Sequence, residues 1–115
     1  MSPPSPIPAD LAEAVPVFAA LGDATRLALV NRLSTAGPLS IARLTAGSQK
    51  TRQAITKHLR VLADAGLVRD ARWGREHRWE LEPDRLSQAR RSLDQISRQW
   101  DGALARLKTY VEESP

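Results

Sequence analysis

One stretch constrains the fold of this 115-residue chain more than any other, the segment from Leu39 to Gly66. Its apolar residues recur at helical spacing on both sides of a polar interruption, Gly47 to Lys50, which is the pattern of two helices joined by a tight turn. Gly47 can adopt the left-handed backbone with which many helices end. Thr51 can cap the second helix by accepting a hydrogen bond from a free backbone N–H, and Gly66 can end it. The segment therefore predicts a helix-turn-helix unit.

Each of these two helices should bury one face. The first offers a short apolar stripe of Leu39, Ala42 and Leu44. The second, at about residues 51–65, offers a longer stripe formed by Ala54, Ile55, His58, Leu59, Leu62 and Ala65. Its opposite face carries side chains that are cationic or form hydrogen bonds, namely Arg52, Gln53, Thr56, Lys57 and Arg60.

That exposed face has the residue types that read DNA. A helix of about 15 residues fits the major groove, where Arg bonds guanine, Gln bonds adenine and Thr can contact thymine. The first two turns of a recognition helix are the part that reaches base edges. From the helix alone, a charged face that merely contacts solvent explains the pattern equally well. The candidates for base reading are Thr51, Arg52, Gln53, Thr56 and Lys57.

The residues that follow, 67–81, predict a basic β-hairpin. Leu67-Val68 begins a strand, Trp73-Gly74-Arg75-Glu76 supplies a turn, and the alternation from Arg78 to Leu81 gives a second strand. Helix, turn, helix and basic hairpin is the layout of a winged helix-turn-helix protein, in which wing arginines touch phosphates or enter the minor groove. The candidates for contact with the DNA backbone are Ser48, Lys50, His58, Arg60, Arg72, Arg75 and Arg78.

Three segments together resemble the ArsR/SmtB family of bacterial winged-helix repressors. Residues 51–59, TRQAITKHL, are similar to the family pattern Ser-Gln-x-x-Val-Ser-Lys-His-Leu, and residues 62–68, LADAGLV, match Leu-x-x-Ala-Gly-Leu-Val. Residues 20–26, ALGDATR, match Ala-Leu-x-Asp-x-Thr-Arg, so the similarity covers roughly residues 15–111. The resemblance implies a mainly α fold with a small β-hairpin (α+β). It also implies five helices and a homodimer formed through the first and last of them.

The segments before the helix-turn-helix complete one domain of residues 9–113. Residues 1–8, MSPPSPIP, are rich in proline and predict a disordered arm. We expect a turn near residues 10–14, a helix that begins at Pro16, and a second helix from Ala24 that Asp23 caps. Arg26 should tie the structure together near that helix start, with a phosphate contact as the alternative. The helix that begins at Ala24 should bury Leu27, Leu29, Val30 and Leu33.

The last helix, from Pro83 to about residue 112, has an apolar seam of the kind found in coiled coils. A helix of about 28 residues spans about 42 Å, more than a domain this small needs to cover its core. The seam either lies on its own domain or packs in part on a second copy of the chain, and we favour the second copy. The candidate interface residues are Phe18, Leu86, Ala89, Leu93, Ile96, Trp100, Ala103, Leu107 and Tyr110.

Metal sensing is not expected of this chain. It has no cysteine, and Ser40 and Ala42 stand where some members of the resembled family have a Cys-x-Cys metal site. The last helix has aspartates but no histidine, and His58 and His77 are the only imidazoles. Transition-metal sites require several converging nitrogen or sulfur ligands. We therefore predict no metal and no other cofactor, and a small-molecule or protein effector is left open.

These patterns predict a homodimeric, sequence-specific regulator of transcription that binds double-stranded DNA. By resemblance it is a repressor, and its twofold geometry predicts an inverted-repeat operator. The alternative is a winged-helix protein-interaction module whose basic face is only solvated. No nucleophile–base pair or phosphate-cradling glycine loop points to an enzyme. The net charge of +4 suits a polyanionic partner, and the lack of a membrane span or signal peptide predicts a cytoplasmic location.

Overall fold

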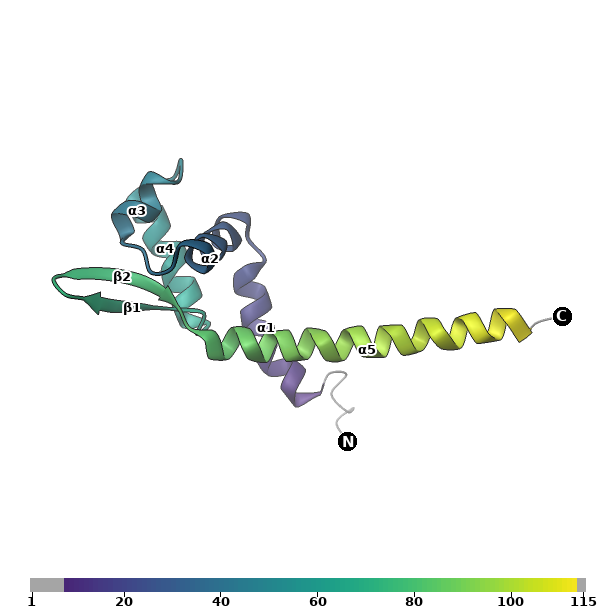
Figure 1. Ribbon diagram of the computed structural model, residues 1–115. Helices are drawn as coiled ribbons and strands as arrows, with labels where there is room; N and C mark the ends of the chain where they lie inside the picture. The colour runs from purple at the N-terminus through teal and green to yellow at the C-terminus, as the bar shows by residue number, and fades with distance from the viewer. Residues whose placement is uncertain (1–7, 114–115) are drawn as a thin grey trace, which may run out of the picture.

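The computed structural model describes residues 8–113 and has a winged helix-turn-helix fold (Figure 1). Its elements in chain order are α1 (Ala9–Leu21), α2 (Ala24–Ala36), α3 (Ile41–Ala46), α4 (Arg52–Asp64), β1 (Val68–Trp73), β2 (Glu76–Leu81) and α5 (Pro83–Glu113). Figure 1 shows the hairpin projecting from one end of the domain and the second half of α5 extending away from the other elements. The predicted arm, residues 1–8, lies outside the described residues except for Pro8, which precedes α1.

The core lies where α2, α3 and α4 meet the base of the hairpin. Its most deeply buried side chains come from α3, α4 and the start of the wing: Leu44, Ile55, Leu59, Leu62 and Leu67. They combine with buried residues of α1 and α2 and with Ala89 of α5 into one cluster. The helical stripe that the sequence predicts for the second helix of the helix-turn-helix is confirmed at Ile55, Leu59 and Leu62, while Ala54, His58 and Ala65 are half-buried. This core fixes the helix-turn-helix and the wing to each other.

Short-range signals in the sequence set most of the helix boundaries. The Oγ1 of Thr51 accepts a hydrogen bond from the backbone N–H of Ala54 at 3.1 Å, which confirms the predicted cap of α4. Asp23 accepts from the N–H of Arg26 at 3.0 Å at the start of α2. Gly66, just after α4, has a φ of 78°, a conformation that glycine adopts at little cost.

The wing is an antiparallel hairpin whose base rests on the core. Its register runs from Val68 opposite Leu81 to Trp73 opposite Glu76, so Gly74-Arg75 forms the two-residue turn that the sequence predicts. Two hydrogen bonds of 2.8 and 3.0 Å join Trp79 of β2 to Leu39, which lies just before α3. The first half of the helix-turn-helix is thereby attached to the wing.

The structure corrects three predictions about the first half of the helix-turn-helix. Leu39 is buried but lies outside the helix, and Ala42 is exposed rather than buried. Gly47 has a φ of −84° and is therefore not left-handed. It leaves room for the guanidinium of Arg32, which a Cβ at this position would push aside. That guanidinium donates to the carbonyls of Leu44 and Arg43 at 2.9 and 3.0 Å, and so caps the end of α3.

Two expectations for the N-terminal helices are also wrong. α1 is one helix that contains Pro16, not a turn followed by a helix that begins there. Pro16 is exposed and removes only the hydrogen bond to the carbonyl four residues earlier, while Ala14, Val17 and Ala20 of the same helix are buried. That burial offsets the lost bond. In α2, Leu27 is 53% exposed, because it lies to one side of the strip on which its other apolar residues are buried.

The apolar seam of α5 divides into two parts. Leu86 and Ala89 pack on the core of their own domain. Beyond them the seam is open, and its large apolar side chains are 41–74% exposed: Leu93, Ile96, Trp100, Leu104, Leu107, Tyr110 and Val111. No helix between residues 8 and 113 is both long enough and apolar enough to cross a bilayer. This half of α5 therefore presents apolar surface that the rest of the described chain leaves uncovered.

Candidate nucleic-acid interface

The first turns of α4 present most of the predicted base-reading side chains together. Arg52, Gln53, Thr56 and Lys57 line one shallow hollow on the surface, and Thr51 immediately precedes them as the cap. Arg52, Gln53 and Lys57 are exposed, while the hydroxyl of Thr56 donates to the carbonyl of Arg52 at 2.8 Å. Thr56 therefore offers its methyl group and its remaining acceptor capacity. The helix face that the sequence predicts for base contact is available for it.

The cations of this face are not neutralised by the protein. Within residues 8–113, Arg52, Lys57 and Arg60 take part in no ion pair. Burial of the opposite face on the core holds the helix, and the Thr51 cap fixes its first turn. An exposed helix face of unpaired cations has the electrostatics that favour contact with a polyanion.

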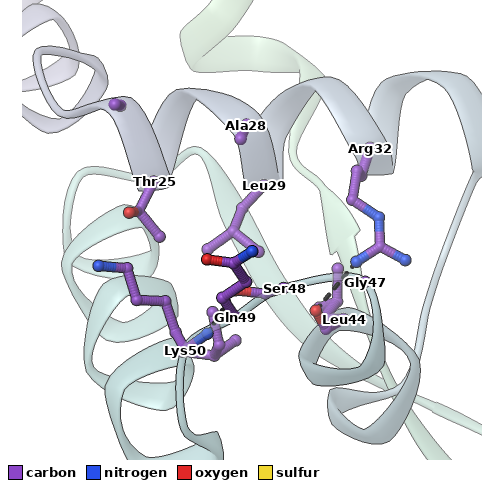
Figure 2. A pocket seen from close by; sticks show the side chains of 11 residues that line it. Thr25, Ala28, Leu29, Arg32, Leu44, Gly47, Ser48, Gln49 and Lys50 are labelled. Carbon is purple, nitrogen blue, oxygen red and sulfur yellow. Dashed lines mark hydrogen bonds between the residues drawn. The ribbon is translucent and has the colours of Figure 1, made fainter.

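The turn before α4 adds two of the predicted backbone-contact residues. The hydroxyl of Ser48 accepts a hydrogen bond from the backbone N–H of Lys50 at 3.0 Å, so it orders the turn. The side chain of Lys50 is exposed. Both residues also line a separate hollow between the turn and α2 (Figure 2).

The arginines of the wing differ in how strongly the chain engages them. Arg78 is paired with Glu76 at 3.2 Å and lies over the ring of Trp73, 5.4 Å from its centroid. Arg72 donates from its Nε to the carbonyl of Gly74 at 3.1 Å, which steadies the turn. Arg75 occupies the turn itself, is exposed, and makes no side-chain hydrogen bond or ion pair to another residue of 8–113. Arg75 is therefore the wing cation most available to a phosphate.

Farther from the tip of the wing, charged side chains pair with side chains of opposite charge in the same hairpin or just after it. Arg69 bonds Glu80 at 2.8 Å and Glu82 at 3.1 Å. The hydrogen bond to Glu80, with the negative charge of Glu82, raises the pKa of Arg69 above its usual value. His77 lies 3.3 Å from Asp70. The positive character of the wing is therefore concentrated at its tip.

His58 lies apart from the other predicted DNA contacts. Its Nδ1 is 3.8 Å from the Oδ2 of Asp23 and 3.4 Å from Nη1 of Arg26, and its side chain is 24% exposed. Arg26 also donates from its Nε to the carbonyl of Ala20 at 2.6 Å, which confirms its role as a structural tie. His58 thus joins α4 to the start of α2. This placement does not favour its assignment as a phosphate contact, which stays a prediction.

Asp23 is the anionic member of this junction between helices. The backbone N–H of Arg26 donates to its carboxylate and is the main cause that lowers the pKa of Asp23 below its ordinary value. The positive charge of Arg26 lowers it further. Asp23 is therefore ionised at neutral pH, and its cap of α2 is then at full strength.

Sequence reasoning missed two residues of this region. Trp73 is 48% exposed beside the wing turn, and the sequence pattern indicates it only as part of that turn. Arg32 supports the turn from α2 through a contact that no local pattern indicates.

Between residues 8 and 113, no group of three or more His, Cys, Asp or Glu side chains could hold a metal ion.

Comparison with known proteins agrees with this geometry. A family described as "Helix-turn-helix domain" matches residues 21–71. The chain is 40% identical over 93 residues to the HTH-type transcriptional regulator Rv2034 of Mycobacterium tuberculosis, which covers 81% of this chain and 83% of that protein. It is 30% identical over 84 residues to the arsenical resistance operon repressor of Escherichia coli, covering 73% of this chain and 72% of the repressor. The folds also agree with a solved structure, the ArsR-like transcriptional regulator from Rhodococcus sp. RHA1. That comparison has a TM-score of 0.75 and 37% identity, and it covers 90% of this chain and 96% of the other.

The fold and the exposed basic helix define a winged helix-turn-helix regulator of transcription, and not an enzyme. The chain belongs to the ArsR family of transcriptional regulators, as its sequence motifs predict.

Proposed function

We propose that this regulator binds an inverted-repeat operator as a homodimer and represses transcription by occupying it. The observation that supports this most strongly is the exposed face of α4, where Arg52, Gln53 and Lys57 occupy the first two turns and neither cation forms an ion pair within residues 8–113. These residue types can form hydrogen bonds with base edges in the major groove. Arg75 at the wing tip would contact a DNA phosphate. The regulator would act in the cytoplasm.

The proposed dimer rests on the open half of the α5 seam. Fully burying a large apolar side chain stabilises an assembly by about 1.5–3 kcal/mol, and at least seven such side chains of α5 are exposed here. Phe18 of α1 is half-buried against the core and could extend the same contact. A twofold axis would place two α4 helices in successive major grooves, about 34–36 Å apart. An inverted repeat in the operator follows from that symmetry.

The alternative is a winged-helix protein-interaction module that lacks specific DNA binding. Such a module has no need of unpaired cations on both α4 and the tip of the wing. Arg52, Lys57 and Arg60 on α4 and Arg75 on the wing therefore favour the DNA-binding function. A steep decrease in affinity with salt, in addition to sequence preference, separates the two hypotheses.

Two substitutions should affect DNA binding in different ways. Gln53→Ala should change the preferred bases, at a cost of about 1–3 kcal/mol on the preferred site, because it removes hydrogen bonds to a base edge. Arg75→Ala should weaken binding to all sequences alike and lower the slope of log K against log salt by about one, because it removes a phosphate contact. Fluorescence anisotropy on the upstream DNA of the regulator's own gene and on a scrambled duplex, over a salt series, measures both effects.

Lys108→Gln is the matched control for the loss of one positive charge. Lys108 is exposed on the distal part of α5, and its one ion pair within the described chain is with Glu112. This variant should retain the affinity, the base preference and the salt slope. An unchanged base preference in Gln53→Ala would show that Gln53 does not read bases. A change as large in Lys108→Gln as in Arg75→Ala would show that net charge alone is responsible.

A further inference from the structure

A hollow of about 300 Å³ separates α2 from the turn that precedes α4 (Figure 2). Leu29, Leu44 and Ile55 form its floor, and each is at most 3% exposed. Its rim is polar, with the side chains of Thr25, Arg32, Ser48, Gln49 and Lys50. The volume is at the lower end of the range of small-molecule sites, which is about 300–1,000 Å³. An apolar floor with a polar rim is the usual composition of such sites.

The charge of the rim has one sign. Arg32 and Lys50 contribute positive charge, and no Asp or Glu is among the eleven lining residues. Lys50 takes part in no ion pair within residues 8–113. The guanidinium of Arg32 donates only to the two carbonyls at the end of α3, so no carboxylate in the described chain neutralises it. The hollow therefore favours an anionic ligand.

Arg32 is also fixed in place before any ligand arrives. Its two bonds to backbone carbonyls hold the guanidinium at the edge of the hollow, and Gly47 leaves the space that it occupies. A Cβ at position 47 would displace the guanidinium. A cation held in this way loses little conformational freedom when it binds an anion.

We propose that this hollow binds a small organic anion that has a carboxylate and a compact apolar body. The carboxylate would lie at the rim, where Arg32 and Lys50 supply positive charge, and the apolar body would cover Leu29 and Leu44. A free phosphate or a phosphate of DNA would use the rim but leave the apolar floor uncovered. The floor is therefore the feature that favours an amphipathic ligand over a phosphate.

A ligand in the hollow would change DNA binding through the turn. Ser48, Gln49 and Lys50 line the hollow, and they lead directly to Thr51 and Arg52, the first residues of the proposed reading face. A ligand that moves or rigidifies this turn therefore changes the affinity for DNA, and DNA changes the affinity for the ligand by the same factor. This part of the inference rests on the proposed function.

Amide chemical shifts of the full ¹⁵N-labelled chain, measured by NMR without DNA, test the site directly. The probes are benzoate and hexanoate, and the uncharged controls are benzamide and hexanamide. We expect saturable shifts at residues 24–32 and 47–50 with the carboxylates. The amides should bind about two- to fivefold more weakly, which corresponds to the loss of a partly exposed ion pair. Repeating the titration at saturating operator DNA measures the coupling.

Three variants make the test specific. Lys50→Gln should narrow the difference in affinity between benzoate and benzamide, because Arg32 alone then supplies positive charge at the rim. Ala28→Leu should abolish binding of both, because Ala28 lines the hollow and a larger side chain fills it. Ala42→Leu is the control, since Ala42 is exposed on α3 and lies outside the hollow. It should bind the probes like the wild type.

Four results would overturn the inference: no saturable shifts, shifts centred on residues 52–57, equal affinity for acid and amide, or unchanged binding in Ala28→Leu. If the probes fail to bind but Lys50→Gln weakens DNA binding at every sequence, the inference is overturned, and Lys50 acts only as the contact with the DNA backbone that the sequence predicts. Because the probes are tested without DNA, their failure does not affect the proposed DNA binding. A chain that binds the carboxylates but no DNA would refute the proposed function alone.

Discussion

Ile96→Asp should convert the proposed dimer to a monomer and lower its affinity for an inverted repeat by about a hundredfold. Ile96 is 41% exposed in the middle of the open α5 seam. In a dimer it would be buried, and an unpaired carboxylate among apolar side chains costs several kcal/mol. About 1.4 kcal/mol corresponds to a tenfold change in an equilibrium constant. The loss follows because a monomer holds one half-site at a time and lacks the avidity of two. Sedimentation equilibrium at micromolar concentration and a DNA titration measure the two effects.

Ala105→Asp is the control for the added charge. Ala105 is exposed on α5 but lies outside the heptad positions of the seam, so this variant should remain dimeric. A stable Ile96→Asp dimer would show that the seam is not the interface between copies. Dissociation of both variants alike would point to the added charge and not to the seam.

Leu59→Ala should lower the free energy of unfolding by about 2–5 kcal/mol. Leu59 is 0% exposed on α4, so the substitution leaves a cavity in addition to the lost burial. Small domains have a total stability of about 5–15 kcal/mol, and this one change therefore removes a large fraction of it. Urea denaturation at one fixed protein concentration measures the loss. The concentration must be fixed because the proposed dimerisation would also stabilise the folded state.

Leu27→Ala provides the same chemical change at a surface position. Leu27 is 53% exposed on α2, and its substitution should cost well under half as much as that of Leu59. Equal losses for the two variants would contradict the position of the core. Leu27→Ala should also retain DNA binding, because the contacts that position α4 are unchanged.

The parts of the fold that sequence predicted depend on contacts between near neighbours in the chain. The Thr51 cap joins residues three apart, and the cap formed by Asp23 does the same. The turn at Gly74-Arg75 and the end of α4 at Gly66 need only the local backbone freedom of glycine. The cationic face of α4 follows from helical periodicity. Such features can be predicted from the sequence pattern because the residues that produce them lie close together in the chain.

The features that sequence missed depend on residues far apart in the chain. Gly47 was expected to be left-handed, but its role is set by Arg32, fifteen positions earlier. Leu39 pairs with Trp79 of the wing and so lies outside α3. His58 turns toward Asp23 and Arg26 because α2 and α4 meet there. Each of these contacts exists only once the helices have packed, so no local pattern encodes it.

The same limit applies to Pro16 and to α5. Local rules place a proline at the start of a helix, but burial of three neighbouring residues of α1 keeps it inside one. The heptad pattern of α5 predicts the apolar seam. It does not predict at which residue the seam ceases to pack on the core of its own domain. The structure places that boundary between Ala89 and Leu93, since the first is 4% exposed and the second 53%.

Sequencing the genomic DNA fragments that the purified protein retains is the most direct measurement of the central claim, that two copies present α4 to neighbouring major grooves. The wild-type protein should enrich an inverted repeat whose half-site centres lie about 10 base pairs apart, one turn of the duplex. Gln53→Ala, processed in parallel, should enrich a repeat of the same spacing with a changed base in each half-site. No enriched motif, or a motif without twofold symmetry from a folded wild-type protein, would contradict the claim.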